Sequence, residues 1–305
     1  LFFVANQQPL YLQEMSGYQL TKVHGQHLLT NPAVITNIIT QAQIRPSDTV
    51  LEIGPGSGNL TLKLLEVAHK VVAIEIDPRM VSELKKRIPA ELRHKLVLIH
   101  GDFCTLADLP EFDLCVSNCP YNVSSQIIFK LLSLAHENSR IRQFTLMFQL
   151  EFAQSLAALP NQSAYSRLSV NTRLLTKSMK ILFKVDPKNF TPPPLVDSAV
   201  IQITPLSDIG LTTQELLQFE GLTKVLFSTK NKMTRAILNT RGVQNQLIEN
   251  YKMVTKEDID KDEVKKRVME VLTELGCEEK RPFQMDVTEF LQLLTEMRKK
   301  QLYLG

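Results

Sequence analysis

Short apolar segments alternate with amphipathic ones from residue 49 to residue 148, and this alternation restricts the fold more than any other feature. The apolar segments cover residues 49–53, 71–74, 96–99, 114–116 and 144–148. The segments between them, among them 59–68 and 124–135, carry their apolar residues at helical spacing. Short strands that are apolar throughout and alternate with helices are typical of a parallel sheet covered on both faces. We therefore predict an α/β fold with a mostly parallel, Rossmann-like sheet.

The pattern changes after residue 150. Residues 151–176 have a helical pattern, and the apolar runs 179–185 and 198–203 follow with no helix between them, which predicts an antiparallel pair of strands at the end of the sheet. Past residue 205 we expect only helices, over residues 214–227, 232–238, 262–275 and 286–298. The predicted organisation is a lead-in over 1–30, an α/β domain over 31–205 and a small helical domain over 206–305.

A glycine-rich loop follows the first strand of the alternating region. It reads Gly54-Pro55-Gly56-Ser57-Gly58 and leads directly into a helix. Glycines at alternate positions permit a tight turn and a close approach of the backbone to a ligand, and the helix N-terminus offers free N–H groups. The third glycine comes one residue earlier than in the dinucleotide-binding pattern. The shorter loop favours a ligand without a pyrophosphate, such as S-adenosylmethionine.

Acidic residues end the next two strands. Glu75 stands 21 residues after Gly54, where a carboxylate can accept hydrogen bonds from both ribose hydroxyls. Asp102 follows the third strand and can accept a hydrogen bond from the adenine amine of the same ligand. We expect the neighbours of these two acids, Ile76 and Phe103, to line the cofactor site.

The tetrapeptide Asn118-Cys119-Pro120-Tyr121 follows the fourth strand. The exocyclic amine of adenine is a poor nucleophile, because its lone pair is delocalised into the ring. Two acceptors aimed at its N–H groups favour the geometry needed for attack on a methyl group. We predict that the Asn118 side chain and the Cys119 carbonyl are these acceptors, that Pro120 fixes the turn, and that Tyr121 stacks on the flipped base. Asn118 is also expected to border the cofactor.

The composition argues against a broadly basic surface, a metal site and a membrane-spanning helix. The chain is 44% hydrophobic and 22% charged, with a net charge of +3, so a nucleic-acid surface would have to be a local patch. Its four cysteines form no CxxC pair, and we expect reduced thiols and no metal site. No apolar run approaches ~18 residues, so no membrane-spanning helix is expected.

With these motifs the chain resembles the dimethyladenosine transferase family, from about Gln26 to its end. Four further strings carry the resemblance: Gly25-Gln26-His27-Leu28-Leu29, Phe148-Gln149-Leu150-Glu151-Phe152-Ala153, Tyr165-Ser166-Arg167-Leu168-Ser169-Val170, and Phe190-Thr191-Pro192-Pro193-Pro194-Leu195-Val196-Asp197-Ser198. Members of this family dimethylate two adjacent adenosines near the 3′ end of small-subunit ribosomal RNA. The chain departs from the family at Cys119, where leucine is usual, and at Leu150, where many members carry a basic residue.

The resemblance implies further site residues and partners. Gln26, His27 and Leu28 would border the cofactor, and Phe190 would face the target base opposite Tyr121. The triple proline and Lys230-Asn231-Lys232 are similar to the branch that serves eukaryotic cytoplasmic ribosomes. The expected partners are small-subunit ribosomal RNA and a pre-ribosomal particle, with the protein acting as a monomer. The expected location is the nucleus and nucleolus, and also the cytoplasm on pre-ribosomes, rather than mitochondria.

Four basic residues are candidates for RNA binding. Lys230, Lys232 and Arg235 lie close together and can bind phosphates of a hairpin stem, or they can form an ordinary solvated helix face. Arg167 can contact RNA or belong to a buried ion pair.

Two other functions are compatible with the sequence. The first is DNA adenine methylation, against which the chain offers no separate recognition domain of the usual size. The second is a non-catalytic assembly or transcription factor on the same fold, against which the intact loop and tetrapeptide argue.

Overall fold

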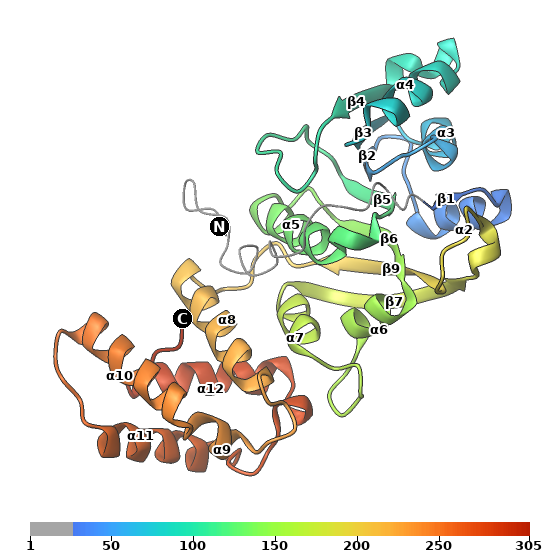
Figure 1. Ribbon diagram of the computed structural model, residues 1–305. Helices are drawn as coiled ribbons and strands as arrows, with labels where there is room; N and C mark the ends of the chain where they lie inside the picture. Colours follow the sequence, from blue (N-terminus) through green and yellow to red (C-terminus); the bar gives the residue numbers. More distant parts are fainter. Residues whose placement is uncertain (1–26) are drawn as a thin grey trace. The chain divides into compact units, whose positions relative to one another are not determined.

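The computed structural model describes residues 27–305, which form two compact units (Figure 1). The first unit holds residues 27–154 and Leu175–Ile209, and the second holds Ser155–Leu174 and Gly210–Gly305. No helix within residues 27–305 is long and apolar enough to cross a membrane. Gln26, one of the expected cofactor-bordering residues, lies outside the described residues.

A seven-stranded sheet forms the centre of the first unit. Its strands are β2 (Thr49–Ile53), β3 (Lys70–Glu75), β4 (Leu96–His100), β5 (Leu114–Asn118), β6 (Gln143–Gln149), β7 (Thr176–Val185) and β9 (Ser198–Pro205). They lie in the order β4-β3-β2-β5-β6-β9-β7. The first five pair in parallel, whereas β9 pairs antiparallel with both β6 and β7. The predicted α/β class, with its antiparallel pair at the end of the sheet, is confirmed.

Helices cover both faces of this sheet (Figure 1), as the continuously apolar strands require. They are α2 (Pro32–Ala42), α3 (Asn59–Val67), α4 (Pro78–Arg87) and α5 (Ser124–Glu137). The N-terminus of α2 forms as the sequence suggests, because the Asn31 side chain accepts a hydrogen bond from Ala33 N and Pro32 is the first helical residue. Buried residues of α2 and α3 then join those of β2, β3 and β5 in one apolar cluster.

A second, two-stranded sheet was not predicted. β1 (Leu28–Leu29) pairs antiparallel with β8 (Phe190–Thr191), so that Leu29 lies opposite Phe190. Strands of two residues carry no periodicity of their own, and this pairing depends on segments far apart in the sequence. It brings the segment that begins at His27 to the segment that contains the triple proline.

Helices make up the second unit. They are α7 (Arg167–Leu174), α8 (Thr213–Phe227), α9 (Thr234–Leu238), α10 (Arg241–Thr255), α11 (Lys261–Glu274) and α12 (Val287–Lys299), whereas α6 (Leu150–Ala157) spans the division between the units. Short 3₁₀ turns complete the chain: η1 (Ala90–Lys95), η2 (Tyr121–Val123), η3 (Pro187–Asn189) and η4 (Pro282–Gln284). The helix α10 was missed in the sequence.

The two units do not divide at residue 205 alone. The segment Ser155–Leu174, expected in the first domain, packs with the later helices instead. The fully buried Tyr165 donates its hydroxyl to Met285 O at 2.8 Å, and Thr223 Oγ1 of α8 donates to Asn171 Oδ1 of α7 at 3.0 Å. A continuous helical stretch over 151–176 was also wrong, because the chain turns after Ala157 through Asn161, whose φ is 70°.

Candidate functional site

The site lies where the strand order reverses. From β2 the chain adds β3 and β4 on one side and β5 and β6 on the other, and open α/β sheets bind ligands at such a reversal, beyond the carboxyl ends of the strands. The glycine loop and the Asn118–Tyr121 tetrapeptide therefore become neighbours. Ser117 Oγ donates to Ile53 O at 2.5 Å, and a Cβ on Gly54 would stand 3.5 Å from Pro120 Cδ.

The glycine loop needs its glycines for two different reasons. Gly56 and Gly58 both have positive φ, at 55° and 87°, which other residues rarely adopt. Each is also closely covered, since a Cβ would come within 2.7 Å of Leu28 Cδ2 at Gly56 and within 2.2 Å of Leu84 Cδ1 at Gly58. Leu28, expected to border the cofactor, therefore lies directly against this loop.

Glu75 is built into the same loop. It is 2% exposed, and its two carboxylate oxygens accept hydrogen bonds from Gly56 N at 3.0 Å and from Asp77 N at 2.9 Å. Each oxygen keeps a second lone pair that can accept from a ribose hydroxyl. The carboxylate thus fixes the loop and keeps both oxygens able to accept a further hydrogen bond.

Ile76 and Phe103, the residues that follow the two acids, differ in how far their side chains are exposed. Ile76 is 53% exposed and offers an apolar side chain next to Glu75. Asp102 Oδ1 accepts from Cys104 N at 2.8 Å, which holds the carboxylate in a tight turn. Phe103, expected to line the adenine ring, is instead 3% exposed, and Lys130 Nζ stands 5.0 Å from its ring centroid. In this structure the exposed apolar surface beside the acids therefore comes from Ile76.

Glu52 is a residue of the site that the sequence analysis missed. It lies on β2 two residues before Gly54, it is 1% exposed, and its Oε2 has no hydrogen-bond partner within the described chain. Burial raises the pKa of Glu52 to about 8, with the nearby Glu75 contributing and the Thr61 hydroxyl partly offsetting the shift. An acid between the apolar residues Leu51 and Ile53 of a buried strand was the signal that could have revealed it.

The Asn118 side chain is held in one orientation. Its Nδ2 donates to the backbone oxygen of His27 at 3.2 Å, and since a carbonyl oxygen can only accept, the amide cannot be reversed. Its Oδ1 is buried and has no hydrogen-bond partner among residues 27–305. A buried acceptor without a donor is costly, so this atom marks a position where a donor from a ligand would be stabilised.

Cys119 and Tyr121 of the tetrapeptide differ in their burial and in their contacts. Cys119 is 2% exposed, and burial raises the pKa of its thiol to about 12, so the thiol stays protonated. Tyr121 Oη lies 2.7 Å from Ser198 Oγ, and burial raises the pKa of Tyr121. The ring that faces Tyr121 belongs to His27, at 6.2 Å between centroids and 26° between planes.

Phe190 was expected opposite Tyr121, and the structure places it differently. Its side chain is 3% exposed and belongs to the apolar cluster beneath α2 and α3, where it pairs across from Leu29. Phe190 lies on β8, two residues before Pro192, whose carbonyl oxygen is 2.8 Å from His27 Nδ1. A stacking role would require the ring to leave this cluster.

The expected RNA-binding residues divide into two kinds. Lys232 is exposed with no ion pair within the described chain, and Arg235 is exposed beside Glu279 at 3.6 Å. Lys230 instead donates to Ser163 O at 3.0 Å and Tyr165 O at 2.9 Å, and so fixes a turn of the second unit. Both lysines precede α9, which begins at Thr234, rather than lying on a helix face as expected.

Arg167 lies on α7 beside Glu220 of α8. Burial raises the pKa of Glu220 to about 7, and the Arg167 charge limits that rise. This arrangement favours the ion-pair alternative for Arg167 over direct contact with RNA.

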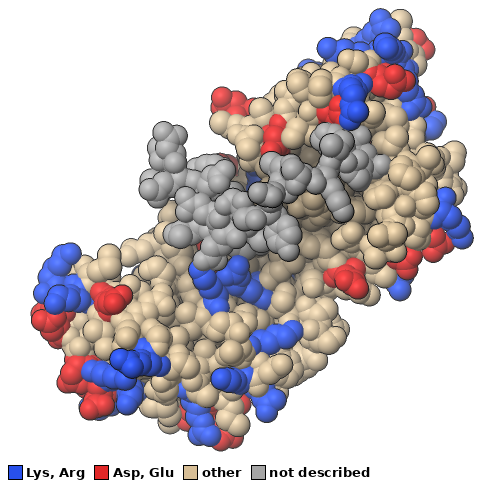
Figure 2. Space-filling model, viewed as in Figure 1, with Lys and Arg blue, Asp and Glu red and all other residues tan. Residues whose placement is uncertain are grey.

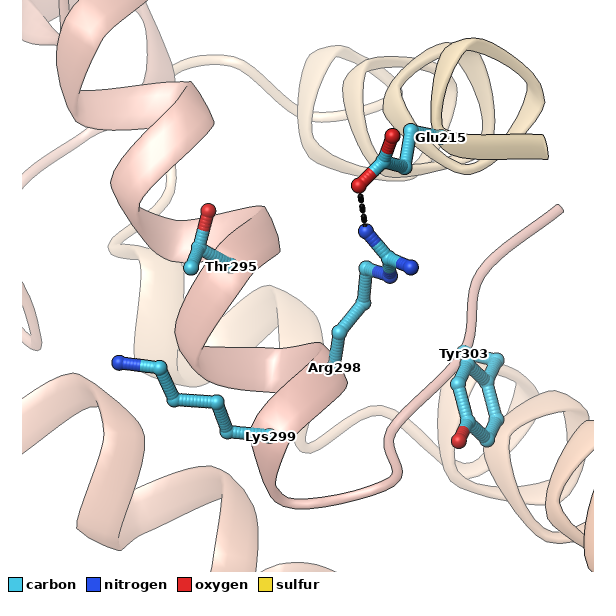
Figure 3. A pocket seen from close by; sticks show the side chains of 5 residues that line it. All are labelled: Glu215, Thr295, Arg298, Lys299 and Tyr303. Carbon is cyan, nitrogen blue, oxygen red and sulfur yellow. Dashed lines mark hydrogen bonds and ion pairs between the residues drawn. The ribbon is translucent and has the colours of Figure 1, made fainter. Parts of the chain in front are cut away.

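The second unit also has a surface hollow that contains none of the expected site residues. Glu215, Thr295, Arg298, Lys299 and Tyr303 line it, and Arg298 forms an ion pair with Glu215 (Figure 3). On the face shown in Figure 2, Lys and Arg side chains are interspersed with acidic ones, in keeping with the mild net charge of +3. Within residues 27–305 no three His, Cys, Asp or Glu side chains are grouped so as to hold a metal ion.

Fold and site together define an S-adenosylmethionine-dependent methyltransferase with a Rossmann-like sheet. The family model of ribosomal RNA adenine dimethylases matches residues 17–275. The chain belongs to this family, and it is an enzyme that dimethylates adenine in ribosomal RNA.

Individual relatives agree with this assignment. The "Probable dimethyladenosine transferase" of Dictyostelium discoideum is 43% identical over 94% of this chain and 91% of its own length. The "Dimethyladenosine transferase" of Yarrowia lipolytica is 42% identical over 92% of this chain and 89% of its own.

Two solved structures are similar as well. The crystal structure of a dimethyladenosine transferase from Plasmodium falciparum is 39% identical, has a TM-score of 0.82, and covers 92% of this chain and 100% of its own. That of the 23S rRNA methyltransferase ErmE is 26% identical, has a TM-score of 0.62, and covers 89% of this chain and 99% of its own.

Proposed function

We propose that this enzyme transfers two methyl groups from S-adenosylmethionine to N6 of each of two adjacent adenosines near the 3′ end of small-subunit ribosomal RNA. Similarity to the dimethyladenosine transferases, at 39–43% identity, supports this substrate over the large-subunit RNA named for ErmE, whose identity is 26%. The preference for RNA over DNA rests on membership of the ribosomal RNA adenine dimethylase family.

The observation that carries the mechanism is the unpartnered Oδ1 of Asn118. It is buried, it stands at the carboxyl end of β5, and its amide is fixed by His27 O. A flipped adenine supplies the N–H donor that this oxygen lacks. The carbonyl oxygen of Cys119, which receives no hydrogen bond from a described residue, is available as the second acceptor. Two acceptors hold the amine in the geometry that attack requires.

The cofactor residues fit the same reaction. Glu75 would bind the ribose hydroxyls, Ile76 would pack on the nucleoside, and the backbone of the Gly54–Gly58 loop would lie against the amino-acid end. S-adenosylmethionine, when bound there, supplies an electrophilic methyl group. Tyr121 stacks on the target base, and the proton released from the methylated amine passes to water.

The protein acts as a monomer on a pre-ribosomal particle in the nucleus and nucleolus, and also on cytoplasmic pre-ribosomes. The eukaryotic relatives and the triple proline at Pro192 support this branch over a mitochondrial one. An added role in small-subunit assembly belongs to the same proposal.

Single-turnover methylation tests both the substrate and the mechanism. Parent enzyme and Asn118→Ala are incubated with labelled S-adenosylmethionine and, separately, with small-subunit RNA, large-subunit RNA and DNA. Primer extension then locates the product, because dimethylation blocks the Watson–Crick edge. We expect two adjacent stops near the 3′ end of small-subunit RNA, and a rate for Asn118→Ala that is lower by on the order of 10²–10³.

The other outcomes are equally informative. Product on large-subunit RNA or DNA alone would refute the proposed substrate. An unchanged rate for Asn118→Ala would show that the tetrapeptide is only a structural turn. RNA binding without methylation by the parent enzyme would favour the non-catalytic assembly factor.

A further inference from the structure

His27 occupies a position between the two halves of the site. On one side its neighbour Leu28 covers Gly56, and Asn59 Nδ2 at the start of α3 donates to Leu29 O at 2.7 Å. On the other side, the backbone oxygen of His27 receives the Asn118 amide, and its ring faces that of Tyr121. The segment from His27 to Leu29 therefore joins the cofactor loop to the target-base tetrapeptide.

The imidazole has a fixed tautomer. Its Nδ1 lies 2.8 Å from the carbonyl oxygen of Pro192, which can only accept, so Nδ1 carries a hydrogen. This hydrogen bond ties the backbone of His27 to the segment after β8, beyond the last residue pair of the small sheet, Leu28 with Thr191. Because β1 and β8 pair over only two residues each, the imidazole adds a side-chain restraint on His27 beyond the end of this pairing.

A chain of two hydrogen bonds links Pro192 to the Asn118 amide. The Pro192 carbonyl holds the His27 imidazole, and the His27 carbonyl holds Asn118 Nδ2. If Nδ2 lost this acceptor, the amide could rotate and present its NH₂ group to the adenine amine, which is also a donor. Orientation of the amide therefore decides whether Asn118 attracts or repels the substrate.

We propose that His27 is a positioning residue for methyl transfer: through its Nδ1–H bond to Pro192 it holds the backbone carbonyl that orients the Asn118 amide toward the target amine. This inference rests on the proposed function, since it requires Asn118 to bind the adenine amine. It assigns His27 a role besides bordering the cofactor.

Replacing His27 by asparagine or by glutamine tests this role, because the side-chain amides of these two residues differ in reach by one carbon atom. The Nδ2 of asparagine can occupy the place of the histidine Nδ1, whereas the Nε2 of glutamine lies one carbon further out. We expect His27→Gln and His27→Ala to lower the single-turnover rate at saturating cofactor by up to about 10²-fold, and His27→Asn to recover most of the parental rate. Equal rates for the Asn and Gln variants would overturn the proposal. So would recovery of the Ala variant by excess S-adenosylmethionine, because that result indicates cofactor binding alone.

A pH profile and a double substitution complete the experiment. The Nδ1–H donor is present in both protonation states of the imidazole, and among residues 27–305 the titratable side chain that faces the ring is Tyr121. Parent and His27→Asn should therefore share one pH profile, and an acidic limb lost only in the variant would identify His27 as a base instead. Adding His27→Ala to Asn118→Ala should lower the residual rate no further, and an additive loss would contradict action through Asn118.

The result separates this proposal from the function on which it depends. If Asn118→Ala keeps the parental rate, the proposed mechanism fails. If Asn118→Ala is inactive while all three His27 variants match the parent, only the positioning role fails.

Discussion

Replacing Glu52 with glutamine should stabilise the protein in a manner that depends on pH. The pKa of Glu52 in the folded protein is about 8 because the carboxyl group is buried, against an ordinary value of 4.5. Between these two values the folded state holds a proton that the unfolded state releases, so stability falls as the pH rises. Glutamine is similar in size and stays neutral, so Glu52→Gln avoids this loss.

The magnitude follows from the size of the shift. At pH 7 the difference from the ordinary pKa is 2.5 pH units, and at about 1.4 kcal/mol per unit the variant should be more stable by about 3 kcal/mol. Above pH 8 the difference should level off at about 5 kcal/mol, and below pH 4.5 it should vanish.

Urea unfolding of the cofactor-free protein at pH values from 5 to 9 measures this difference. The exposed Glu249 of α10 provides a control, since Glu249→Gln should behave like the parent at every pH. A Glu52→Gln variant with a stability difference that does not change with pH would refute the reasoning. It would show that the carboxylate is ionised and satisfied in the folded protein.

Three further predictions concern the cofactor, the RNA and the second unit. Glu75→Gln should weaken binding of S-adenosylhomocysteine by ~1.5–3 kcal/mol without affecting RNA binding, because a charge-assisted acceptor is lost; calorimetry showing equal affinity would remove Glu75 from the site. Joint replacement of Lys232 and Arg235 by alanine should lower the salt dependence of RNA binding by up to about 0.9 per lost phosphate contact on a duplex, and equal slopes would assign them to a solvated surface. Glu215→Gln should destabilise the protein by about 1 kcal/mol at pH 7. The Thr212 backbone and side chain and the Arg298 guanidinium lower the pKa of Glu215 to about 2, so its contribution is complete above pH 4.5 and lost as the pH falls toward 2. An equal deficit in urea unfolding at pH 7 and pH 3 would contradict this.

The sheet was predictable because each strand is apparent from its own run of apolar residues. Each residue of β2 is buried, and the apolar runs of β3 and β5 carry the same signal without help from distant parts of the chain. Because these runs fix where the strands end, they also show which functional residues stand at the strand ends. The glycine loop, Glu75 and Asn118 could thus be assigned to one edge of the sheet from the sequence.

Features without an apolar periodicity of their own were not predictable. α10 was missed because one of its buried positions is Gln244, whose Nε2 donates to Leu238 O at 2.8 Å, so polar sequence masks the apolar face. The hydrogen bond between Asn118 and His27 joins residues 91 positions apart and leaves no periodic trace. The burial of Phe190 likewise follows from its pairing with β1.

The composition of the second unit from two separate stretches of chain has a practical consequence for genetics. A stop codon placed after residue 209 would remove α8 and leave α7 behind, although α7 buries Val170, Asn171 and Leu174 in the folded protein. In such a product the buried face of α7 has lost the helix that it packs against, which favours aggregation and proteolysis. Loss of activity in that truncation would therefore say nothing about whether the C-terminal helices bind RNA. Point substitutions on their surface answer that question, and frameshift or nonsense alleles do not.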